Sequence, residues 1–210
     1  MSRFGSDPLT FFHSVYHETP PWDIGGPQPA MSTLLAKYPP NDPILDVGCG
    51  SGDLAIHLAQ LGHQVIGVDF VEAAIAQGQE KVAALPAEVA RLLDFQVADA
   101  LRPSLLQRQF GSVVDSGFFH LFEPEQCDHF IDELALTLLP GGRYYLHAFA
   151  IEFPVPNVPR QVNADELQAR FTSDRGWHIR EVQSAEFLSR VAPPVPATAA
   201  CIERLPAKPS

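Results

Sequence analysis

The stretch DVGCGSG at residues 46–52 decides the fold, because it joins a short apolar run to an amphipathic segment. Residues 44–47 are apolar and bounded by proline and glycine, as expected of a buried parallel strand. Leu54, Leu58 and Leu61 then follow at helical spacing. Glycines at such a turn allow positive φ and let a ligand approach the bare backbone, so the stretch predicts a binding loop for a nucleoside or nucleotide.

Outward from this loop the sequence alternates strand and helix patterns, which predicts an open α/β sheet with its ligand beyond the carboxyl ends of the strands. Runs at 177–182 and 185–191 lie too close together for an intervening helix, so we expect them to form an antiparallel hairpin. We expect the other strands at residues 44–47, 65–68, 95–97, 112–115 and 143–149, and helices at 54–61, 71–85, 125–138 and 164–171.

Length and composition suit one globular domain, with 210 residues of which 46% are hydrophobic and 19% charged. We expect a cap or lid segment at residues 1–40, a core at 41–192 and a C-terminal strand or tail at 193–210. The 20 prolines form clusters that flank the expected sheet. One cluster, at 154–159, follows the fifth strand and is expected to form a stiff wall on the substrate side.

The charge pattern and cysteine usage exclude several classes of protein. A net charge of −11 argues against a nucleic-acid partner, since phosphate binding depends on clustered Lys and Arg. Apolar runs end short of the roughly 18–20 residues of a membrane span. Cys49, Cys127 and Cys201 lack metal-site spacing and fit a reducing compartment. With no signal-peptide pattern, we expect a cytoplasmic protein with no metal and no membrane partner; nothing predicts its oligomeric state.

Acidic residues stand where successive strands are expected to end. Asp69 follows the second strand and Asp99 the third. Asp69 could accept both ribose hydroxyls and Asp99 the exocyclic amine of an adenine, although either could instead cap a helix or turn. A dinucleotide site would have a third glycine at position 53, where this chain has Asp53, and an acid there repels a diphosphate. The pattern favours a ligand whose charged end is an ammonium or sulfonium.

With these motifs, residues 44–149 resemble the class I S-adenosylmethionine-dependent methyltransferases. The matching motifs are DVGCGSG, VDF at 68–70, VADA at 97–100 and LLPGGRYYL at 138–146. The resemblance implies a Rossmann-like, seven-stranded, mostly parallel sheet with an antiparallel C-terminal hairpin, helices on both faces, and S-adenosyl-L-methionine as cofactor. It implies cofactor contacts from the glycine loop, the ribose-binding acid, the adenine-binding positions and the methyl-donor end, namely Asp46, Gly48, Gly50, Gly52, Asp69, Phe70, Asp99, Ala100 and Ser116.

The upstream stretch TPPWDIGGPQP at residues 19–29 carries a narrower resemblance. It is similar to the segment before the sheet in methyltransferases of the thiopurine, thiol and halide group, and in bacterial enzymes that act on heterocyclic or quinolone-type toxins. This resemblance implies that the segment folds over the cofactor and that Trp22 contacts the methionine end. Without this resemblance, Trp22 could be an ordinary tryptophan that packs at the protein surface and has no role in binding.

The stretch DSGFFHLF at residues 115–122 follows the fourth strand and is expected to face the methyl acceptor. Phe118, Phe119 and Phe122 could wall a flat aromatic molecule. His120 is the best candidate for a general base, because an imidazole titrates near neutrality, and it could equally be a structural histidine. His147 is a weaker candidate. Cys49 is expected to be a small buried side chain and not a nucleophile.

These features predict methyl transfer from S-adenosylmethionine to nitrogen, oxygen or sulfur of a small, aromatic or heterocyclic acceptor. An NAD(P)-dependent oxidoreductase on the same architecture is the rival from another class, and Asp53 disfavours it. A protein methyltransferase or a non-catalytic cofactor-binding module is the third alternative. The sequence does not select the acceptor or its heteroatom.

Overall fold

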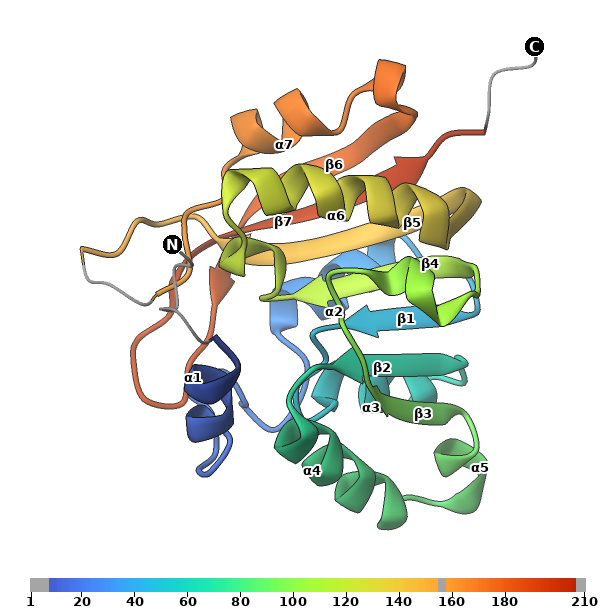
Figure 1. Ribbon diagram of the computed structural model, residues 1–210, viewed down its shortest axis with the longest axis vertical. Helices are drawn as coiled ribbons and strands as arrows, with labels where there is room; N and C mark the ends of the chain where they lie inside the picture. The colour runs from blue at the N-terminus through green and yellow to red at the C-terminus, as the bar shows by residue number, and fades with distance from the viewer. Residues whose placement is uncertain (1–7, 155–157, 207–210) are drawn as a thin grey trace.

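The computed structural model describes residues 8–154 and 158–206. Within them, seven strands form one sheet of order β3-β2-β1-β4-β5-β7-β6 (Figure 1). Strands β1 to β5 pair in parallel, and β7 is antiparallel to both β5 and β6, so the expected Rossmann-like sheet is confirmed. The strands are β1 (Ile44–Val47), β2 (Val65–Asp69), β3 (Leu93–Val97), β4 (Phe110–Ser116), β5 (Leu138–Phe149), β6 (Trp177–Phe187) and β7 (Val195–Arg204).

The position expected for the C-terminal hairpin is wrong. Residues 177–187 form a single strand, β6, with no turn between 182 and 185. Its partner is β7, which lies between β5 and β6 and comes from the segment expected as a strand or tail. Residues 197–202 of β7 are all buried, so they lack the polar alternation that marks a half-exposed strand.

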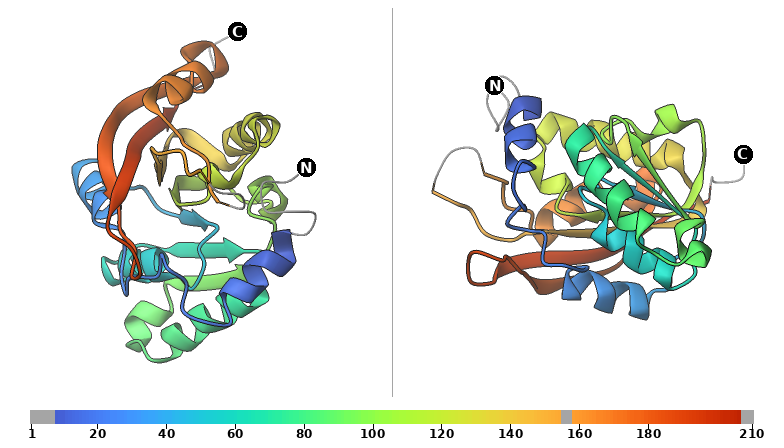
Figure 2. Two further views of the ribbon diagram at one scale, coloured as in Figure 1. Left: turned by 90° about the vertical axis from the view of Figure 1, so that its left-hand side faces the viewer. Right: turned by 90° about the horizontal axis from the view of Figure 1, so that it is seen from below.

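Helices cover both faces of the sheet, as Figure 2 shows from two sides. Ile44 of β1 packs in the cluster that contains residues of α2 (Pro29–Lys37), α3 (Asp53–Gln60) and α4 (Glu72–Ala83). Leu45, the next residue, packs in the opposite cluster with residues of α6 (Pro124–Thr137) and α7 (Ala164–Arg170). The remaining described helices are α1 (Pro8–Val15), α5 (Ala87–Ala90), η1 (Pro103–Leu106), η2 (Phe119–Leu121) and η3 (Ser173–Arg175).

The N-terminal region expected as a cap divides into two parts. Helix α2 packs into the core, where Met31 and Leu34 are 0% and 1% exposed. Residues 8–28, which we name the cap segment, lie with the β6–β7 connection near the carboxyl ends of β1 and β2, on the left of Figure 1. Residues 1–7 of the expected cap lie outside the described residues. Helix α2 is thus part of the core, and within the described part of the expected cap only residues between 8 and 28 line the cavity.

Gly52 joins the glycine loop to α3 with a φ of +83°, in the left-handed region that favours glycine. A Cβ at this position would overlap the Phe95 ring. We therefore expect Gly52→Ala to lower the free energy of unfolding by about 2–3 kcal/mol, through backbone strain and overpacking together. Urea unfolding measures the loss. Gly62→Ala is the matched control, since Gly62 has a φ of +97° but a Cβ there would meet nothing within 4 Å; equal losses in both variants would contradict the Phe95 overlap.

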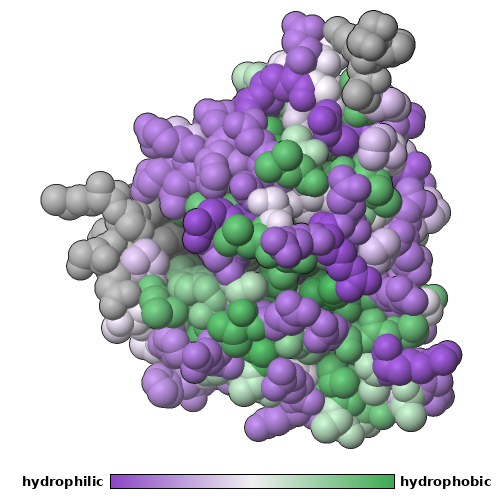
Figure 3. Space-filling view, turned by 45° about the vertical axis from the view of Figure 1, so that its right-hand side comes forward, coloured by the Kyte–Doolittle hydropathy of each residue, from purple (hydrophilic) through white to green (hydrophobic). Residues whose placement is uncertain are grey.

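The surface carries scattered apolar side chains. On the face shown in Figure 3, small hydrophobic patches lie among hydrophilic side chains. The most exposed large apolar residues are Leu61, Leu105 and Leu136, each 63% exposed, and Val191, 74% exposed. Single exposed apolar residues are common on folded proteins and imply no interface. Among the described helices, none combines the length and apolar character needed to cross a membrane.

Candidate active site

A cavity of about 390 Å³ lies where β1, β2 and β4 end. This volume falls in the range of small-molecule sites, roughly 300–1,000 Å³. The glycine loop and the residues after β2 form one side, the turn after β4 forms the other, and the cap segment lies across them. Of the site residues expected from the sequence, the cavity is lined by Trp22, Gly48, Gly50, Asp69, Phe70, Ser116, Phe118 and His120.

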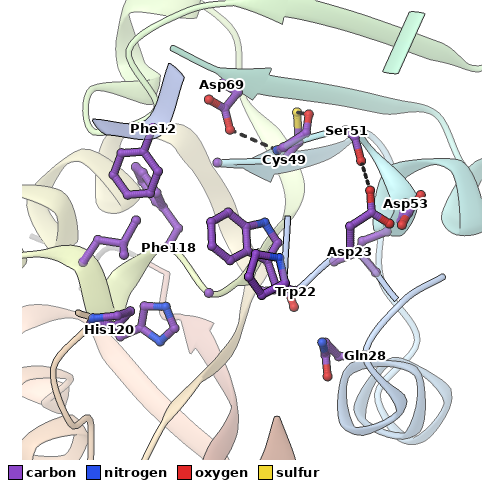
Figure 4. A pocket seen from close by; sticks show the side chains of 18 of the residues that line it. Phe12, Trp22, Asp23, Gln28, Cys49, Ser51, Asp53, Asp69, Phe118 and His120 are labelled. Carbon is purple, nitrogen blue, oxygen red and sulfur yellow. Dashed lines mark hydrogen bonds between the residues drawn. The ribbon is translucent and has the colours of Figure 1, made fainter. Parts of the chain in front are cut away.

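Asp69 at the end of β2 holds the glycine loop in place. Its Oδ2 accepts a hydrogen bond from the Gly50 backbone N–H at 3.0 Å, and its Oδ1 accepts one from the Val71 N–H at 2.9 Å. Burial raises the pKa of Asp69, and these two N–H donors oppose that rise. A carboxylate fixed in this way keeps the Gly50 backbone turned along the cavity wall, as the dashed bond beside Cys49 in Figure 4 shows.

Asp46 lies behind the loop and does not line the cavity. Its side chain is buried, and its Oδ2 has no hydrogen-bond partner among the described residues. Burial and the nearby Asp115 carboxylate raise its pKa well above the ordinary value. A buried acceptor without a partner is costly in a finished core, so this atom marks a place where a hydrogen-bond donor from a ligand or water would be stabilised.

The cap segment is attached to the β6–β7 connection at two points. The Gln28 side chain donates to the Leu188 carbonyl at 3.0 Å and accepts from the Leu188 N–H at 2.9 Å. The Arg190 N–H donates to the Pro21 carbonyl at 2.8 Å. Between these attachments Trp22 lies in the cavity, with its ring 6.2 Å from that of Tyr16. In Figure 4 Trp22 lies between Phe118 and His120 on one side and Asp23 on the other.

A polar cluster ties the cap segment to the glycine loop. Ser51 Oγ donates to Asp23 Oδ2 at 2.8 Å, and Lys81 Nζ contacts Ser51 Oγ at 2.8 Å and Asp53 Oδ1 at 2.5 Å. Burial favours a higher pKa for Asp23, but hydrogen bonds from Asp53 and Ser51 and the Lys81 charge leave that pKa lowered. Burial and the bond to Asp23 raise the pKa of Asp53. The cluster therefore has two carboxyl groups for one ammonium.

The turn after β4 is fixed by Asp115, which is fully buried. Its carboxylate accepts hydrogen bonds from the Phe118 N–H at 2.8 Å, the Phe119 N–H at 3.0 Å and the Tyr144 hydroxyl at 2.7 Å. Burial raises the pKa of Asp115 to about 7 against the opposing effect of these donors. The carboxylate thus sets the direction of the backbone that carries Ser116, Phe118 and His120.

His120 lines the cavity but is only 3% exposed. Its Nδ1 accepts a hydrogen bond from the Phe149 N–H at 3.1 Å, and its ring stacks on the Phe149 ring at 4.6 Å. Burial, followed by the nearby His147 and Arg160, lowers the pKa of His120 to about 3. This geometry gives little support to the general-base role, which stays a prediction. His147 is fully buried, with a pKa that burial lowers to about 4, and lies outside the cavity lining.

Several residues expected at the site lie away from the cavity. Asp99 accepts from the Leu101 N–H at 3.0 Å and pairs with Arg102 at 2.8 Å, as a turn cap would. Phe119 and Phe122 pack on Phe130 in the core. The lining also excludes Gly52, which contacts Phe95, and Ala100, which is buried in the core. Their proposed cofactor and substrate roles stay predictions.

Phe149, Phe153 and Phe187 also line the cavity and were not expected; Phe149 and Phe187 end β5 and β6 at the same edge of the sheet. Val158 and Pro159, from the loop at 154–159 after β5, line it as well. This loop was expected as a substrate-side wall; its residues 155–157 lie outside the described part of the chain. Because Phe149 and Phe187 each end a strand, their positions would have predicted that they face the ligand, provided that the bounds of β6 had been predicted correctly. Asp23 and Gln28 stand in the quoted upstream motif, but the motif alone gave them no role.

The sheet order, the glycine loop and the cavity at the carboxyl edge are those of a Rossmann-like fold that binds its ligand beyond the strand ends. The family model described as "Methyltransferase domain" matches residues 44–142. The chain is 28% identical over 169 residues to the 2-heptyl-1-hydroxyquinolin-4(1H)-one methyltransferase of Mycobacteroides abscessus, covering 79% of this chain and 72% of that protein. It is 28% identical over 149 residues to probable thiol methyltransferase 2 of Arabidopsis thaliana, covering 70% of this chain and 65% of that protein.

A solved structure agrees over nearly the whole chain. This structure was solved in work on the conversion of a disulfide bond into a thioacetal group during echinomycin biosynthesis. Its similarity to this chain has a TM-score of 0.78 with 28% sequence identity, and the match covers 94% of this chain and 93% of that chain. The matched domain, the two relatives and this solved structure support an S-adenosylmethionine-dependent methyltransferase, as the motifs predicted. These similarities support this family over the NAD(P)-dependent oxidoreductase.

The residues at the cavity fit this cofactor. Asp23, Asp53 and Asp69 line the cavity, whereas its described lining contains no lysine or arginine. This acidic lining suits a cationic ligand without phosphates. When bound, S-adenosylmethionine supplies an electrophilic methyl group on a positively charged sulfonium. Among the described residues, no group of three or more potential ligands could hold a metal ion.

Proposed function

We propose that the chain transfers a methyl group to a nucleophilic nitrogen, oxygen or sulfur of a small, flat and mainly apolar molecule. The observation that carries the proposal is the aromatic character of the cavity beyond the turn after β4. We name this part the acceptor wall; it consists of Leu121, Phe149, Phe153, Val158, Pro159 and Phe187. Aromatic faces at such a wall favour a planar ligand, and few polar groups compete for it.

In this proposal the chain holds the cofactor along the glycine loop and orients the acceptor against it. Asp69 and the backbone at Gly48 and Gly50 bind the donor on one side, and Trp22 covers its methionine end. Ser116 and Phe118 stand between donor and acceptor, and Phe70 flanks the adenine. Asp46 lies behind the loop, and in this proposal its unpaired Oδ2 accepts a hydrogen bond from the cofactor or from a water molecule beside it. Because methyl transfer depends mainly on alignment and exclusion of water, closure by the cap segment contributes directly to rate.

The relatives support a small-molecule acceptor. One relative is named for a hydroxyquinolone with a heptyl chain, and another for thiols. A planar heterocycle with an apolar substituent fits the acceptor wall of this chain, and a thiol on an aromatic ring fits it equally well. A protein methyltransferase requires an open groove for a peptide, whereas here the cap segment crosses the cavity and is bonded to Leu188 and Arg190 on its far side.

The test is an acceptor screen with S-adenosylmethionine labelled in its methyl group. Purified protein is incubated with hydroxyquinolones, thiophenols, phenols, aliphatic thiols and halide, and label in the extracted product is counted. We expect turnover with planar aromatic acceptors and at most weak turnover with halide. Phe187→Ala should raise KM for the aromatic acceptors without changing cofactor affinity, since Phe187 belongs to the acceptor wall. Transfer to proteins but to none of the small acceptors would overturn the proposal.

A further inference from the structure

We propose that the methyl acceptor enters this site with its nucleophilic atom already ionised, and that the chain provides no base to deprotonate it. The acceptor class is then a soft, delocalised anion on a planar ring, such as an aromatic thiolate or the anion of an acidic ring hydroxyl. This inference rests on the proposed function and narrows its acceptor. It follows from where the titratable side chains of the cavity lie and from which of their atoms are already bonded.

The acceptor wall itself contains no titratable side chain, since its residues are phenylalanines, Leu121, Val158 and Pro159. The titratable groups of the described lining stand elsewhere, with one exception. Asp23 and Asp53 bond to Ser51 and Lys81, and Asp69 bonds to the loop N–H groups. The complete set in the described lining is Tyr16, Asp23, Cys49, Asp53, Asp69 and His120, and His120 alone follows β4 beside the acceptor wall.

His120 is bonded in a way that opposes proton uptake. Its Nδ1 accepts from the Phe149 N–H, so the neutral ring carries its proton on Nε2. The only ring nitrogen left to accept a proton is then Nδ1, and protonation there would replace the Phe149 bond by an Nδ1–H directed at the Phe149 N–H. Among the described neighbouring groups, His147 of β5 and the charged Arg160 disfavour a positive charge on His120, and only the bond to the Gly117 backbone favours it. Burial acts in the same direction, because it penalises the charged ring.

Asp115 does not replace His120 as a base. Its carboxylate faces away from the acceptor wall into the turn, where Phe118, Phe119 and Tyr144 donate to it. It also does not line the cavity. The carboxylates of the described lining, Asp23, Asp53 and Asp69, are all bonded to the backbone or to a neighbouring side chain.

The acceptor must then satisfy two electrostatic conditions. An apolar wall penalises a charged ligand and raises the pKa of a bound acid, so a localised anion such as an alkoxide is excluded. The positive donor offsets this penalty for an anion beside it. In the transfer, a lone pair of the acceptor anion forms the bond to the methyl carbon while the carbon–sulfur bond breaks and its electron pair remains on sulfur. The negative and positive charges cancel, and no proton moves.

The first test is the pH dependence of kcat/KM for a series of para-substituted thiophenols with different thiol pKa values. We expect kcat/KM for each acceptor to fall as the pH drops below the pKa of its own thiol. The bend in the plot of kcat/KM against pH therefore lies at a different pH for each thiophenol. His120→Asn should keep this moving bend even where its rate is lower, because Asn Oδ1 can still accept the Phe149 N–H. A bend at one pH for all acceptors that disappears in His120→Asn would overturn the inference.

The second test reads the ionisation of the bound acceptor directly. The absorbance of 4-nitrothiophenol is titrated against pH in complexes with sinefungin, which carries an amine in place of the sulfonium, and with S-adenosylhomocysteine, which has neutral sulfur. We expect the apparent thiol pKa to be lower in the sinefungin complex by about 1–3 units. Equal pKa values would overturn the inference. Absence of turnover with every acceptor, despite cofactor binding, would instead overturn the proposed function.

Discussion

Asp69→Ala is expected to weaken binding of S-adenosylmethionine by roughly 100-fold, since hydrogen bonds to a charged group contribute about 1.5–3 kcal/mol each and 1.4 kcal/mol corresponds to a factor of ten. The substitution removes the proposed ribose contacts. It also releases the Gly50 and Val71 N–H groups, which Asp69 now holds at 3.0 and 2.9 Å. The glycine loop therefore loses the bond that directs its backbone along the cavity. Isothermal titration with the cofactor measures the change.

Two controls separate binding from folding. Asp69→Asn keeps the size of the side chain but removes its charge, and we expect an intermediate loss of affinity. Asp99→Asn changes the other strand-end acid, which caps a turn outside the cavity, and should change affinity less than threefold, about 0.6 kcal/mol. Circular dichroism checks that each variant is folded. If Asp99→Asn weakened binding as strongly as Asp69→Ala, the adenine role predicted for Asp99 would be supported and our view of the cavity would be contradicted.

The sequence predicted those parts of the site whose signals are local. DVGCGSG contains both its strand and its helix start within a few residues, and three of its glycines indeed have positive φ at 48, 50 and 52. Asp69 is the last residue of β2 and follows the run VIGV at 65–68, which ends at the same edge. Parallel strands must end beside one another, so a residue at one strand end is placed near the next without knowledge of packing.

Parts of the site that depend on packing between distant segments were not predictable. The three phenylalanines at 118, 119 and 122 read alike in sequence, yet only Phe118 reaches the cavity, because Asp115 fixes a short helical turn that points the others into the core. Gln28 acquires its role only by meeting Leu188, 160 residues away. Strand β7 was expected as a strand or tail, because burial on both faces removes the alternation by which a strand is recognised.

Acid is expected to destabilise the protein through its two buried histidines. Burial lowers the pKa of His120 to about 3 and that of His147 to about 4, from an ordinary value of 6.5. Between pH 6.5 and these values the two histidines bind protons in the unfolded chain but not in the folded chain. Their contribution to the free energy of unfolding is therefore fully present above pH 6.5 and decreases as the pH falls. Asp115, with a pKa that burial raises to about 7, acts in the opposite sense over the same range, because it binds its proton more readily when folded.

A comparison of variants isolates the histidine contribution, since the effect of Asp115 is common to both proteins. In the double variant His120→Asn and His147→Gln, Asn can accept the Phe149 N–H and Gln can donate to the Glu186 carbonyl, as the two rings do. From pH 7 to pH 5 the wild type should lose about 4 kcal/mol more than this variant, at roughly 1.4 kcal/mol per pH unit below 6.5 for each histidine. Urea unfolding at pH 5, 6 and 7 measures the difference. His178→Asn, which replaces an exposed histidine, is expected to follow the wild type; parallel curves for the wild type and the double variant would show that neither ring is kept neutral by the fold.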